Sequence, residues 1–362
     1  MAQARASRGP ATPCVTVLGV GQMGLVCSAI IADPDRAAAE GSTGGAAEPL
    51  GVRLWAHSPD ETAAITQSRR SERLPGFRLG EHARVVLRDE DAFAGSVLVI
   101  SAIPVQFIRV TWERLARHLP PGVPVVSVAK GLESTTLYRP TQIISEVLTD
   151  DPDRAARPIG CLSGPTIAPE LARCLPATMV AASEDEALRA QVQRLFTTRW
   201  LRVYTHHDLV GVELAGALKN VIAIAAGILD GLHAGYNAKS ALLARGLAEI
   251  TRLGSALGAD PQTFFGVAGV GDLATTCFSP EGRNRSLGEA LGKGADLDQY
   301  LAGQKHVVEG VATCRAVVDL ARKYKVEMPI VQAVHAVLFE RLDPIEAIGR
   351  LMTREPKAER VG

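Results

Sequence analysis

The sequence has no excess of charge of either sign, because its 39 lysines and arginines are matched by 39 aspartates and glutamates. This balance offers no global attraction to nucleic acid or to an anionic membrane surface, although a local basic site could still bind a small anion. The six cysteines are scattered, without a C-x-x-C pair or a histidine at metal-ligand spacing. We therefore expect no metal site, and we interpret the cysteines as reduced, mostly buried thiols of a cytoplasmic protein.

The sequence also lacks the apolar segments that secretion and membrane insertion require. Residues 1–13 contain no apolar core of a signal peptide, and we expect them to form a short flexible extension. The longest apolar run, 209–232, is interrupted by Glu213, Lys219, Asn220 and Asp230, which a lipid-facing helix would not carry at its centre. We therefore interpret this run as a buried helix and expect no membrane span.

What the sequence does have is length and apolar periodicity. Its 362 residues, nearly half of them apolar, can fill the cores of two domains. Short apolar runs predict strands at 14–18, 52–55, 83–87, 97–102, 123–129, 159–163, 178–182 and 201–204. Helical patterns take over after residue 205, at 209–232, 238–257, 284–291, 310–324 and 330–338. This order predicts an α/β fold, in which a mostly parallel sheet domain at 14–205 precedes an all-helical substrate-binding and catalytic domain at 206–362.

Two further segments are expected to carry no chemistry. Residues 33–50 are rich in alanine, glycine and proline, which indicates a solvent-exposed insertion between the first helix and the second strand. Residues 350–362 are charged, and we expect them to fray.

The loop 19–24 reads G-V-G-Q-M-G and lies between a predicted strand and a helix at 25–32. In this context glycine lets the backbone approach a pyrophosphate at the helix N-terminus, as in Rossmann-type dinucleotide-binding domains. The alternative is a glycine-rich turn without a ligand. We predict a Rossmann-type domain in which Gly19, Gly21, Gln22, Met23 and Gly24 bind the cofactor.

The end of the second strand does not decide between NAD and NADP. An acidic residue there would hold the ribose 2′-hydroxyl of NAD, but residues 52–59 read V-R-L-W-A-H-S-P. His57 could accept a 2′-phosphate, or it could be a solvent-exposed loop histidine. We include His57 among the cofactor-binding candidates.

Two lysines stand where an ammonium group is costly. Lys219 lies within an apolar helical pattern, and Lys130 follows a strand, at the edge of the sheet where ligands bind in open α/β folds. If both converge on one site, burial and mutual repulsion lower the pKa of each and prepare one of them for proton transfer. The alternatives are a lysine whose ammonium reaches the surface and an ordinary loop lysine.

Polar residues further along the chain complete a possible site for a phosphorylated substrate. Asp272 could offset the two lysines or cap the helix that follows, and Thr276 could share its helical face or pack its methyl group inward. Arg283 and Asn284 precede a helical pattern and could cradle a phosphate, or they could be exposed loop residues.

Four segments, taken together with the glycine loop, resemble the NAD(P)-dependent glycerol-3-phosphate dehydrogenase family. They are V-A-K-G-L-E at 128–133, S-G-P-T-I-A at 163–168, E-L-A-G-A-L-K-N at 213–220, and G-D-L-A-T-T-C at 271–277 followed by G-R-N-R at 282–285. The resemblance extends in order from about residue 15 to residue 338. It implies an enzyme that interconverts sn-glycerol 3-phosphate and dihydroxyacetone phosphate with NAD or NADP, supplies the glycerophospholipid backbone and forms a homodimer.

The resemblance also assigns roles to individual residues. Lys219 is implied to transfer the proton, with Lys130 and Asp272 as the other catalytic residues. The substrate-binding residues are implied to be Lys130, Gly164, Thr166, Lys219, Asn220, Asp272, Thr276, Arg283 and Asn284. The cofactor-binding residues outside the glycine loop are implied to be His57, Phe107, Lys130, Ala168, Arg283, Val307 and Glu309.

The sequence departs from the family pattern around the cofactor. The family's first loop commonly reads G-x-S/N-W/F-G-T, whereas Gln22, Met23, Gly24 and Leu25 follow Gly21 here. His57 replaces a frequent arginine after the second strand, and Gly282 stands where a serine often precedes the phosphate-loop arginine. These departures leave the group needed for proton transfer in place and make the preference for NADH or NADPH an open question.

Two other functions remain open at this stage. One is a related dehydrogenase of another hydroxy acid or phosphorylated polyol, and the other is a non-catalytic dinucleotide sensor. The Arg283–Asn284 pair favours a phosphorylated substrate over the first, and the joint presence of Lys130, Lys219 and Asp272 argues against the second.

Overall fold

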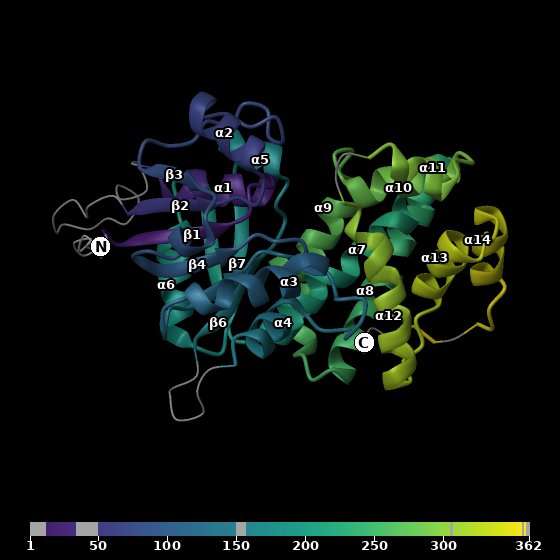
Figure 1. Ribbon diagram of the computed structural model, residues 1–362. Helices are drawn as coiled ribbons and strands as arrows, with labels where there is room; N and C mark the ends of the chain where they lie inside the picture. Colours follow the sequence, from purple (N-terminus) through teal and green to yellow (C-terminus); the bar gives the residue numbers. More distant parts are fainter. Residues whose placement is uncertain (1–11, 34–49, 150–156, 305–306, 357, 360–362) are drawn as a thin grey trace, which may run out of the picture.

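The apolar runs in the first half of the chain form one eight-stranded sheet (Figure 1). The computed structural model describes residues 12–33, 50–149, 157–304, 307–356 and 358–359. The strands are β1 Cys14–Leu18, β2 Gly51–Trp55, β3 Ala83–Val86, β4 Ser96–Ser101, β5 Val125–Ser127, β6 Ile159–Ser163, β7 Ala177–Ser183 and β8 Leu201–His206. Their order in the sheet is β3-β2-β1-β4-β5-β6-β7-β8, and every neighbouring pair is parallel except β6 with β7. The predicted mostly parallel sheet is confirmed.

Helices cover both faces of this sheet. They are α1 Gln22–Ile31, α2 Pro59–Ser68, α3 Val105–Leu115, α4 Pro140–Val147, α5 Ala168–Ala172 and α6 Glu186–Phe196, with short 3-10 turns at Asp89–Asp91 and Ala116–His118. Val17 and Leu18 are consecutive on β1 but belong to different hydrophobic clusters, one containing residues of α1, α5 and α6 and the other residues of α3 and α4. Strands buried on both faces explain why the sequence shows continuous apolar runs rather than alternation.

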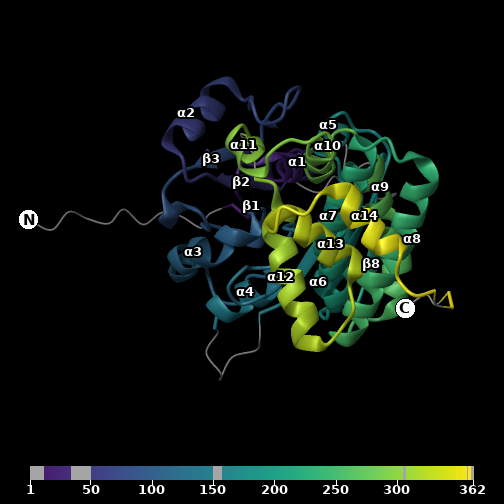
Figure 2. The same ribbon diagram turned by 90° about the vertical axis from the view of Figure 1, so that its right-hand side faces the viewer.

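The chain after β8 is helical. The helices are α7 Leu209–Gly231, α8 Gly235–Ala256, α9 Asp272–Phe278, α10 Arg283–Gly292, α11 Leu297–Ala302, α12 Glu309–Tyr324, α13 Pro329–Phe339 and α14 Pro344–Met352. A 3-10 turn at Pro261–Phe265 and a π-helical turn at Val267–Gly271 precede α9. The predicted sequence of a sheet domain and then a helical one is therefore confirmed, while α9, α11 and α14 lie outside the predicted helical ranges (Figure 2).

The apolar run at 209–232 becomes α7, the central helix of this second half. By length and composition it could cross a membrane, but 94% of its apolar window is buried inside the protein. The helices α8, α9, α10, α12 and α13 pack around it (Figures 1 and 2). The prediction of a buried core helix is confirmed.

A buried ion pair fixes α7 against the sheet domain. The Glu213 carboxylate on α7 pairs with Arg139 and accepts a hydrogen bond from the backbone N–H of Thr141, at 2.9 Å, in the first turn of α4. Burial raises the pKa of Glu213, and the nearby Arg139 opposes that rise. Because Lys219 lies six residues further along the same helix, this pair places the lysine in register with the sheet edge.

Several smaller predictions can also be compared with the structure. Residues 350–352 belong to α14, so the prediction that fraying begins at Arg350 is wrong for them, because the apolar face of α14 packs against α13. The predicted extension at 1–13 and insertion at 33–50 lie outside the described residues, apart from residues 12–13, 33 and 50. All six cysteines are free thiols, and five of them are buried, with Cys174 exposed.

Candidate active site

A cavity of about 430 Å³ lies where the sheet edge meets the helical half of the chain. One wall comes from segments that follow the carboxyl ends of four adjacent strands, namely Gly21–Met23 after β1, Ala102–Pro104 after β4, Val128–Lys130 after β5 and Thr166–Pro169 after β6. The carboxyl ends of parallel strands meet at one edge, and ligands bind there in open α/β folds. The cavity therefore occupies the position that the sequence predicts for the ligands.

The opposite wall comes from helices far along the chain. It is lined by Lys219 and Asn220 of α7, Asp272, Thr275 and Thr276 of α9, the turn residues Ser279, Glu281 and Gly282, Arg283 and Asn284 of α10, and Val307 and Glu309 at the start of α12. A larger cavity, of about 940 Å³, lies among α7, α8, α13 and α14, and no predicted site residue lines it. Most of the predicted site residues thus line the smaller of these two cavities.

The two predicted lysines share one buried carboxylate. Lys130 Nζ lies 2.7 Å from Asp272 Oδ2, and Lys219 Nζ lies 3.1 Å from Asp272 Oδ1. The Asp272 side chain is 2% exposed, that of Lys219 8% and that of Lys130 16%. A buried ion costs free energy unless it is paired, and this arrangement pairs two ammonium groups with one carboxylate. While both ammonium groups are charged, the cluster carries one net positive charge beside the cavity.

This arrangement distinguishes the two alternatives for Asp272, a partner of the lysines or a helix cap. The N-cap of α9 is Gly271, and Asp272 is the first residue of the helix itself. Its carboxylate points at the two lysines instead of capping the helix. The alternative in which Asp272 is only a helix cap is wrong.

Burial is the main cause that lowers the pKa of Lys219 below the ordinary value for lysine. Asp272 opposes the shift by attracting the charged ammonium, and the positive charge of Lys130 adds to the shift by repelling it. An ammonium with a lowered pKa gives up its proton closer to neutral pH. Lys219 is thus suited to exchange a proton with a bound ligand.

Hydroxyl and carbonyl groups hold the two lysines in place. Lys130 Nζ donates to the Gly164 carbonyl oxygen at 2.9 Å and to Thr166 Oγ1 at 3.3 Å, and Lys219 Nζ donates to Thr276 Oγ1. Gly164 has φ +136°, and a Cβ there would lie 2.9 Å from the Thr178 carbonyl oxygen. Only glycine fits here without strain, so Gly164 shapes the S-G-P-T turn.

Arg283 and Asn284 are the first two residues of α10, rather than a loop before it. The N-cap is Gly282, and no side chain caps this helix start, which leaves room for an anion. Arg283 Nη1 donates to the Val307 carbonyl oxygen at 2.8 Å, and Asn284 Oδ1 accepts from the Gly310 N–H at 3.0 Å. The predicted phosphate-binding and late cofactor-binding segments therefore touch each other.

Glu309 is an acidic residue that lines this corner of the cavity. Removal from water raises the pKa of its carboxyl group, and the nearby charges of Arg283, Lys130 and Lys219 act against that rise. Its position at the start of α12 lets the helix dipole favour the charged form.

Two features fix the start of α10 over the cavity. A Cβ at Gly288 would lie 2.0 Å from the Ile224 carbonyl oxygen of α7, so the two helix backbones approach as closely as glycine permits. Asp230 on α7 forms two ion pairs, one with Arg285 Nε at 2.7 Å and one with Lys239 Nζ at 2.8 Å. The Lys239 ammonium also lies 5.0 Å from the ring centroid of Phe278, the last residue of α9. Both ends of the segment 279–284 are thereby anchored to one charge cluster.

The glycine loop fits the pyrophosphate of a dinucleotide. Gly19 has φ +102°, and a Cβ at Gly24 would lie 2.0 Å from the Gly19 carbonyl oxygen, so both positions need glycine. No side chain caps α1, and nothing lies within 4 Å of a Cβ built at Gly21. The first N–H groups of α1 and the open space at Gly21 leave room for an anion, which is the feature that the predicted pyrophosphate site requires.

The structure brings most predicted site residues to the cavity and leaves five away from its lining. The lining residues are Gly21, Gln22, Met23, Lys130, Thr166, Ala168, Lys219, Asn220, Asp272, Thr276, Arg283, Asn284, Val307 and Glu309. Gly19, Gly24 and Gly164 shape the surrounding backbone, His57 is exposed after β2, and Phe107 on α3 is 50% exposed. Neither Phe107 nor His57 lines the cavity, so their roles in cofactor binding stay predictions.

Sequence reasoning did not find every lining residue. Ala102–Pro104 could have been found, since it follows a predicted strand in the way that Lys130 does. Arg73, which comes from the segment after α2, has no local signal that places it beside the glycine loop. Ser279 and Glu281 lie in the turn between α9 and α10, a boundary that the apolar pattern did not resolve.

Two family models match the chain. The model for the N-terminus of NAD-dependent glycerol-3-phosphate dehydrogenase matches residues 14–189, and the model for its C-terminus matches residues 208–349. The glycerol-3-phosphate dehydrogenase (NAD(P)+) 1 of Salinibacter ruber is 42% identical over 346 residues, which cover 95% of this chain and 96% of that protein. The corresponding protein of Geobacter metallireducens is 46% identical over 312 residues, which cover 86% of this chain and 92% of that protein.

A solved structure agrees with these sequence matches. The glycerol-3-phosphate dehydrogenase of Coxiella burnetii is 30% identical and superposes with a TM-score of 0.84, covering 95% of this chain and 99% of that one. The resemblance inferred from the motifs is thus confirmed over both halves of the chain. The chain belongs to the NAD-dependent glycerol-3-phosphate dehydrogenase family.

Proposed function

We propose that the protein interconverts sn-glycerol 3-phosphate and dihydroxyacetone phosphate with NAD(H) or NADP(H) in the cavity at the sheet edge. The observation that carries the proposal is the Asp272 carboxylate shared by Lys130 and Lys219, which lines the same cavity as the glycine loop and the Arg283–Asn284 helix start. Family membership supports both the substrate and the cofactor. A related dehydrogenase of a substrate without phosphate would have no use for that helix start.

Lys219 is the proton-transfer group. In the oxidation of glycerol 3-phosphate it takes the proton of the C2 hydroxyl, while the two electrons leave C2 with its hydrogen. In the reverse direction it returns the proton to the ketone oxygen. Its lowered pKa suits both directions, because the neutral and charged forms then lie close in free energy.

Asp272 and Lys130 prepare the site for this exchange. Asp272 holds Lys219 at 3.1 Å and so fixes the direction in which its ammonium points. Lys130 contributes positive charge where negative charge develops on the substrate oxygen, and its bonds to Gly164 and Thr166 keep it at that place. Because these groups are already in position, the reaction needs little rearrangement of the protein.

Arg283 and Asn284 bind the substrate phosphate. The arginine supplies a charge-assisted fork, and the uncapped start of α10 supplies N–H donors. Thr276 and Asn220, which also line the cavity, are within the part of the site that would face the substrate hydroxyls. Gly164 and Thr166 complete this side through the loop after β6.

The glycine loop holds the dinucleotide. Gly21, Gln22 and Met23 would face the pyrophosphate, and Ala168, Val307 and Glu309 line the same cavity. A bound dinucleotide would supply the hydride acceptor for C2 in one direction and the hydride donor in the other. We retain His57 and Phe107 as proposed cofactor contacts.

A coupled absorbance assay tests the proposal. Folded protein is mixed with dihydroxyacetone phosphate and either NADPH or NADH, and the loss of absorbance of the reduced cofactor is followed. We expect turnover with at least one cofactor. Well-folded protein that oxidises neither would refute the assigned substrate.

We further propose the cellular setting that family resemblance implies. The enzyme is cytoplasmic, supplies the glycerophospholipid backbone and works as a homodimer, with residues 14–205 as its dinucleotide-binding domain and 206–362 as its substrate-binding domain. Light scattering coupled to size-exclusion chromatography tests the dimer, and a monomeric mass would exclude it. Cell fractionation tests the location.

A further inference from the structure

Arg73 lies between the glycine loop and the first turn of α2. Its carbonyl oxygen accepts a hydrogen bond from Gln22 Nε2 at 2.9 Å, so the unusual glutamine of the glycine loop fixes its backbone. Its guanidinium forms an ion pair with Glu61, in which Nη2 lies 3.3 Å from Oε2. Arg73 also lines the cavity beside Gly21, Gln22 and Met23. Its position is therefore set by the segment proposed to hold the dinucleotide.

This position is next to the expected place of the adenosine ribose. In sheets of this type the ribose lies at the end of the second strand, where an acid meets the 2′-hydroxyl or an arginine meets a 2′-phosphate. Trp55 ends β2, and residues 56–58 that follow it contain no acid. The acids that come next are Asp60 and Glu61, in the first turn of α2. Glu61, which could bind the ribose, is already engaged by Arg73.

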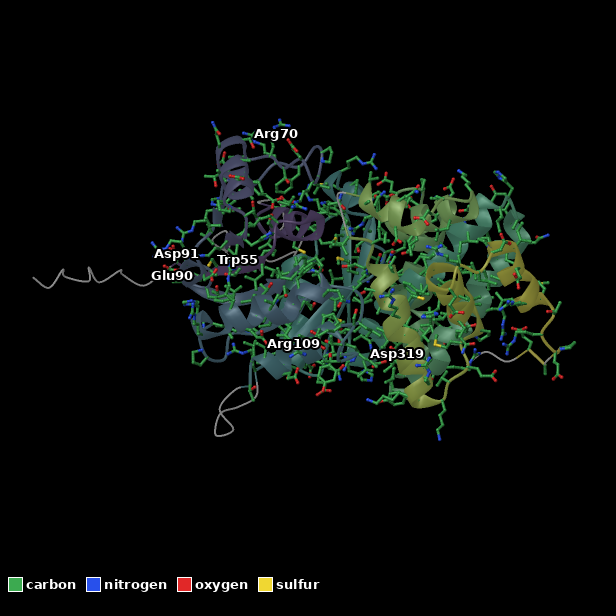
Figure 3. The ribbon with its side chains drawn as sticks, turned by 45° about the vertical axis from the view of Figure 1, so that its right-hand side comes forward. Trp55, Arg70, Glu90, Asp91, Arg109 and Asp319 are labelled. Atoms are coloured by element: carbon green, nitrogen blue, oxygen red, sulfur yellow. The ribbon has the colours of Figure 1, made fainter. Side chains whose placement is uncertain are left out.

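The surrounding charge favours an anion. Residues 69–78 contain four arginines and one glutamate. Arg69 is used internally, since its Nε donates to the Leu79 carbonyl oxygen at 3.1 Å, whereas Arg70 is exposed on the outside of the sheet domain (Figure 3). Arg73 is the arginine of this group that lines the cavity, and its side chain remains 40% exposed. It can thus meet a ligand without burying an unpaired charge.

We propose that Arg73 binds the 2′-phosphate of NADPH, that Glu61 holds the guanidinium until the phosphate takes its place, and that the protein therefore prefers NADPH to NADH. This inference rests on the proposed use of a nicotinamide dinucleotide. A phosphate dianion attracts the guanidinium more strongly than one carboxylate does, and it offers two oxygens to the arginine fork. NADH has no such group, so Arg73 stays on Glu61 when NADH is bound. Arg73 thereby does the work of the arginine that His57 replaces.

The test measures binding without any substrate. The purified full-length protein is titrated with NADPH and with NADH by fluorescence, and adenosine 2′-monophosphate and adenosine 5′-monophosphate serve as competing probes. We expect NADPH to bind roughly tenfold or more tightly, as a charge-assisted arginine–phosphate contact implies. Arg73→Leu should bring the ratio of the two dissociation constants close to one, and Arg73→Lys should retain part of it. The matched control, Arg70→Leu, changes an exposed neighbour and should leave the ratio as it is.

Glu61→Gln tests the carboxylate separately. Removing its charge frees the guanidinium, so NADPH should bind several-fold more tightly and the ratio should rise. The inference is overturned if Arg73→Leu weakens both dinucleotides equally or if the unaltered protein shows no preference. Selective weakening of NADH by Glu61→Gln would also overturn it, because Glu61 would then bind the ribose itself. Since these titrations use no dihydroxyacetone phosphate, a failed activity assay leaves the binding ratio interpretable, and the two proposals fail independently.

Discussion

The two ends of the cavity are built in opposite ways. At one end, Lys219 of α7 and Asp272 of α9 are nearly fully buried, and Lys130 from the segment after β5, whose side chain is 16% exposed, shares the Asp272 carboxylate through short ion pairs. At the end formed by the glycine loop and α2, Arg73 is 40% exposed and rests on Glu61, a carboxylate that is 17% exposed. Both ends are ion-paired, but the pairs at the first end are buried, whereas the second end offers a partly exposed cation that a ligand can capture.

The buried end suits the chemical step, and the exposed end suits the choice between the two cofactors. Proton transfer needs a group held in one position with a shifted pKa, and burial provides both. Discrimination between two cofactors needs only a difference in binding free energy, which a half-exposed arginine can supply. Changes at the first end should therefore alter kcat, and changes at the second should alter the ratio of the two cofactors.

The largest effect is expected from a substitution within the buried cluster of two lysines and one aspartate. Lys219→Ala removes the proton-transfer group, and kcat should fall by roughly 100- to 10,000-fold. Binding of NADPH should stay measurable by fluorescence titration, because the glycine loop is untouched. Lys323→Ala, an exposed lysine on α12, is the control and should keep full turnover. Retained turnover in Lys219→Ala would remove Lys219 from its assigned role.

The next largest effect is expected from Asp272→Asn, which removes the charge of this side chain without changing its size. Asp272 raises the pKa of Lys219, so Asp272→Asn should lower that pKa further. Reduction of dihydroxyacetone phosphate needs the protonated lysine, and its rate falls as the pH rises through this pKa. The falling limb of kcat/KM against pH should therefore move to lower pH. Asp319→Asn, an exposed aspartate on α12 (Figure 3), should leave the limb in place, and an unmoved limb in Asp272→Asn would show that Asp272 does not tune Lys219.

A smaller effect is expected at the phosphate-binding helix start, between the two ends. Arg283→Ala removes a charge-assisted contact, so KM for dihydroxyacetone phosphate should rise by roughly 10- to 100-fold. Unphosphorylated dihydroxyacetone should be affected much less by the same change. Initial-rate measurements with both substrates decide this, and an equal loss with both would place Arg283 outside the phosphate site.

The smallest effect acts through packing alone. Gly288→Ala puts a methyl group 2.0 Å from the Ile224 carbonyl oxygen, so α10 must move away from α7. We expect a loss of about 1–3 kcal/mol in the free energy of unfolding and a several-fold rise in KM, because Arg283 and Asn284 begin the displaced helix. Gly349→Ala in α14, where a Cβ meets nothing within 4 Å, is the matched control and should not lower the melting temperature. An unchanged KM in a destabilised Gly288→Ala protein would show that the helix start does not depend on this crossing.

Much of the fold could be predicted from the sequence because its signals are local. All eight strands lie where apolar runs predict them, and α7 begins at the predicted residue 209. The short helices α9, α11 and α14 lie outside the predicted helical ranges, since seven, six and nine residues carry too little periodicity to stand out. The end of the chain was assigned to fraying because its charge outweighed the apolar face that α14 packs on α13.

Site residues, like the helices and strands, could be predicted only where a local sequence signal marks them. Lys219 and Lys130 could be selected because an ammonium inside an apolar pattern, or at a sheet edge, is costly and so calls for an explanation. Arg73 could not be selected, because an arginine in an arginine-rich surface segment is ordinary. What makes Arg73 distinctive is the bond from Gln22, which is 51 residues away in the chain.

The sequence by itself determined the order of strands and helices, the glycine loop and the identity of the charged residues, because these depend on residue spacing and on the free energy of burying a charge. Only the tertiary structure decided that Asp272 bridges both lysines instead of capping its helix, that α10 touches the α7 backbone, and that Arg73 sits beside the glycine loop. These contacts join segments 51 to 142 residues apart, and they form only when the whole chain packs. A local sequence pattern does not show which residue pairs with a charged side chain, because that pairing depends on how the whole chain packs.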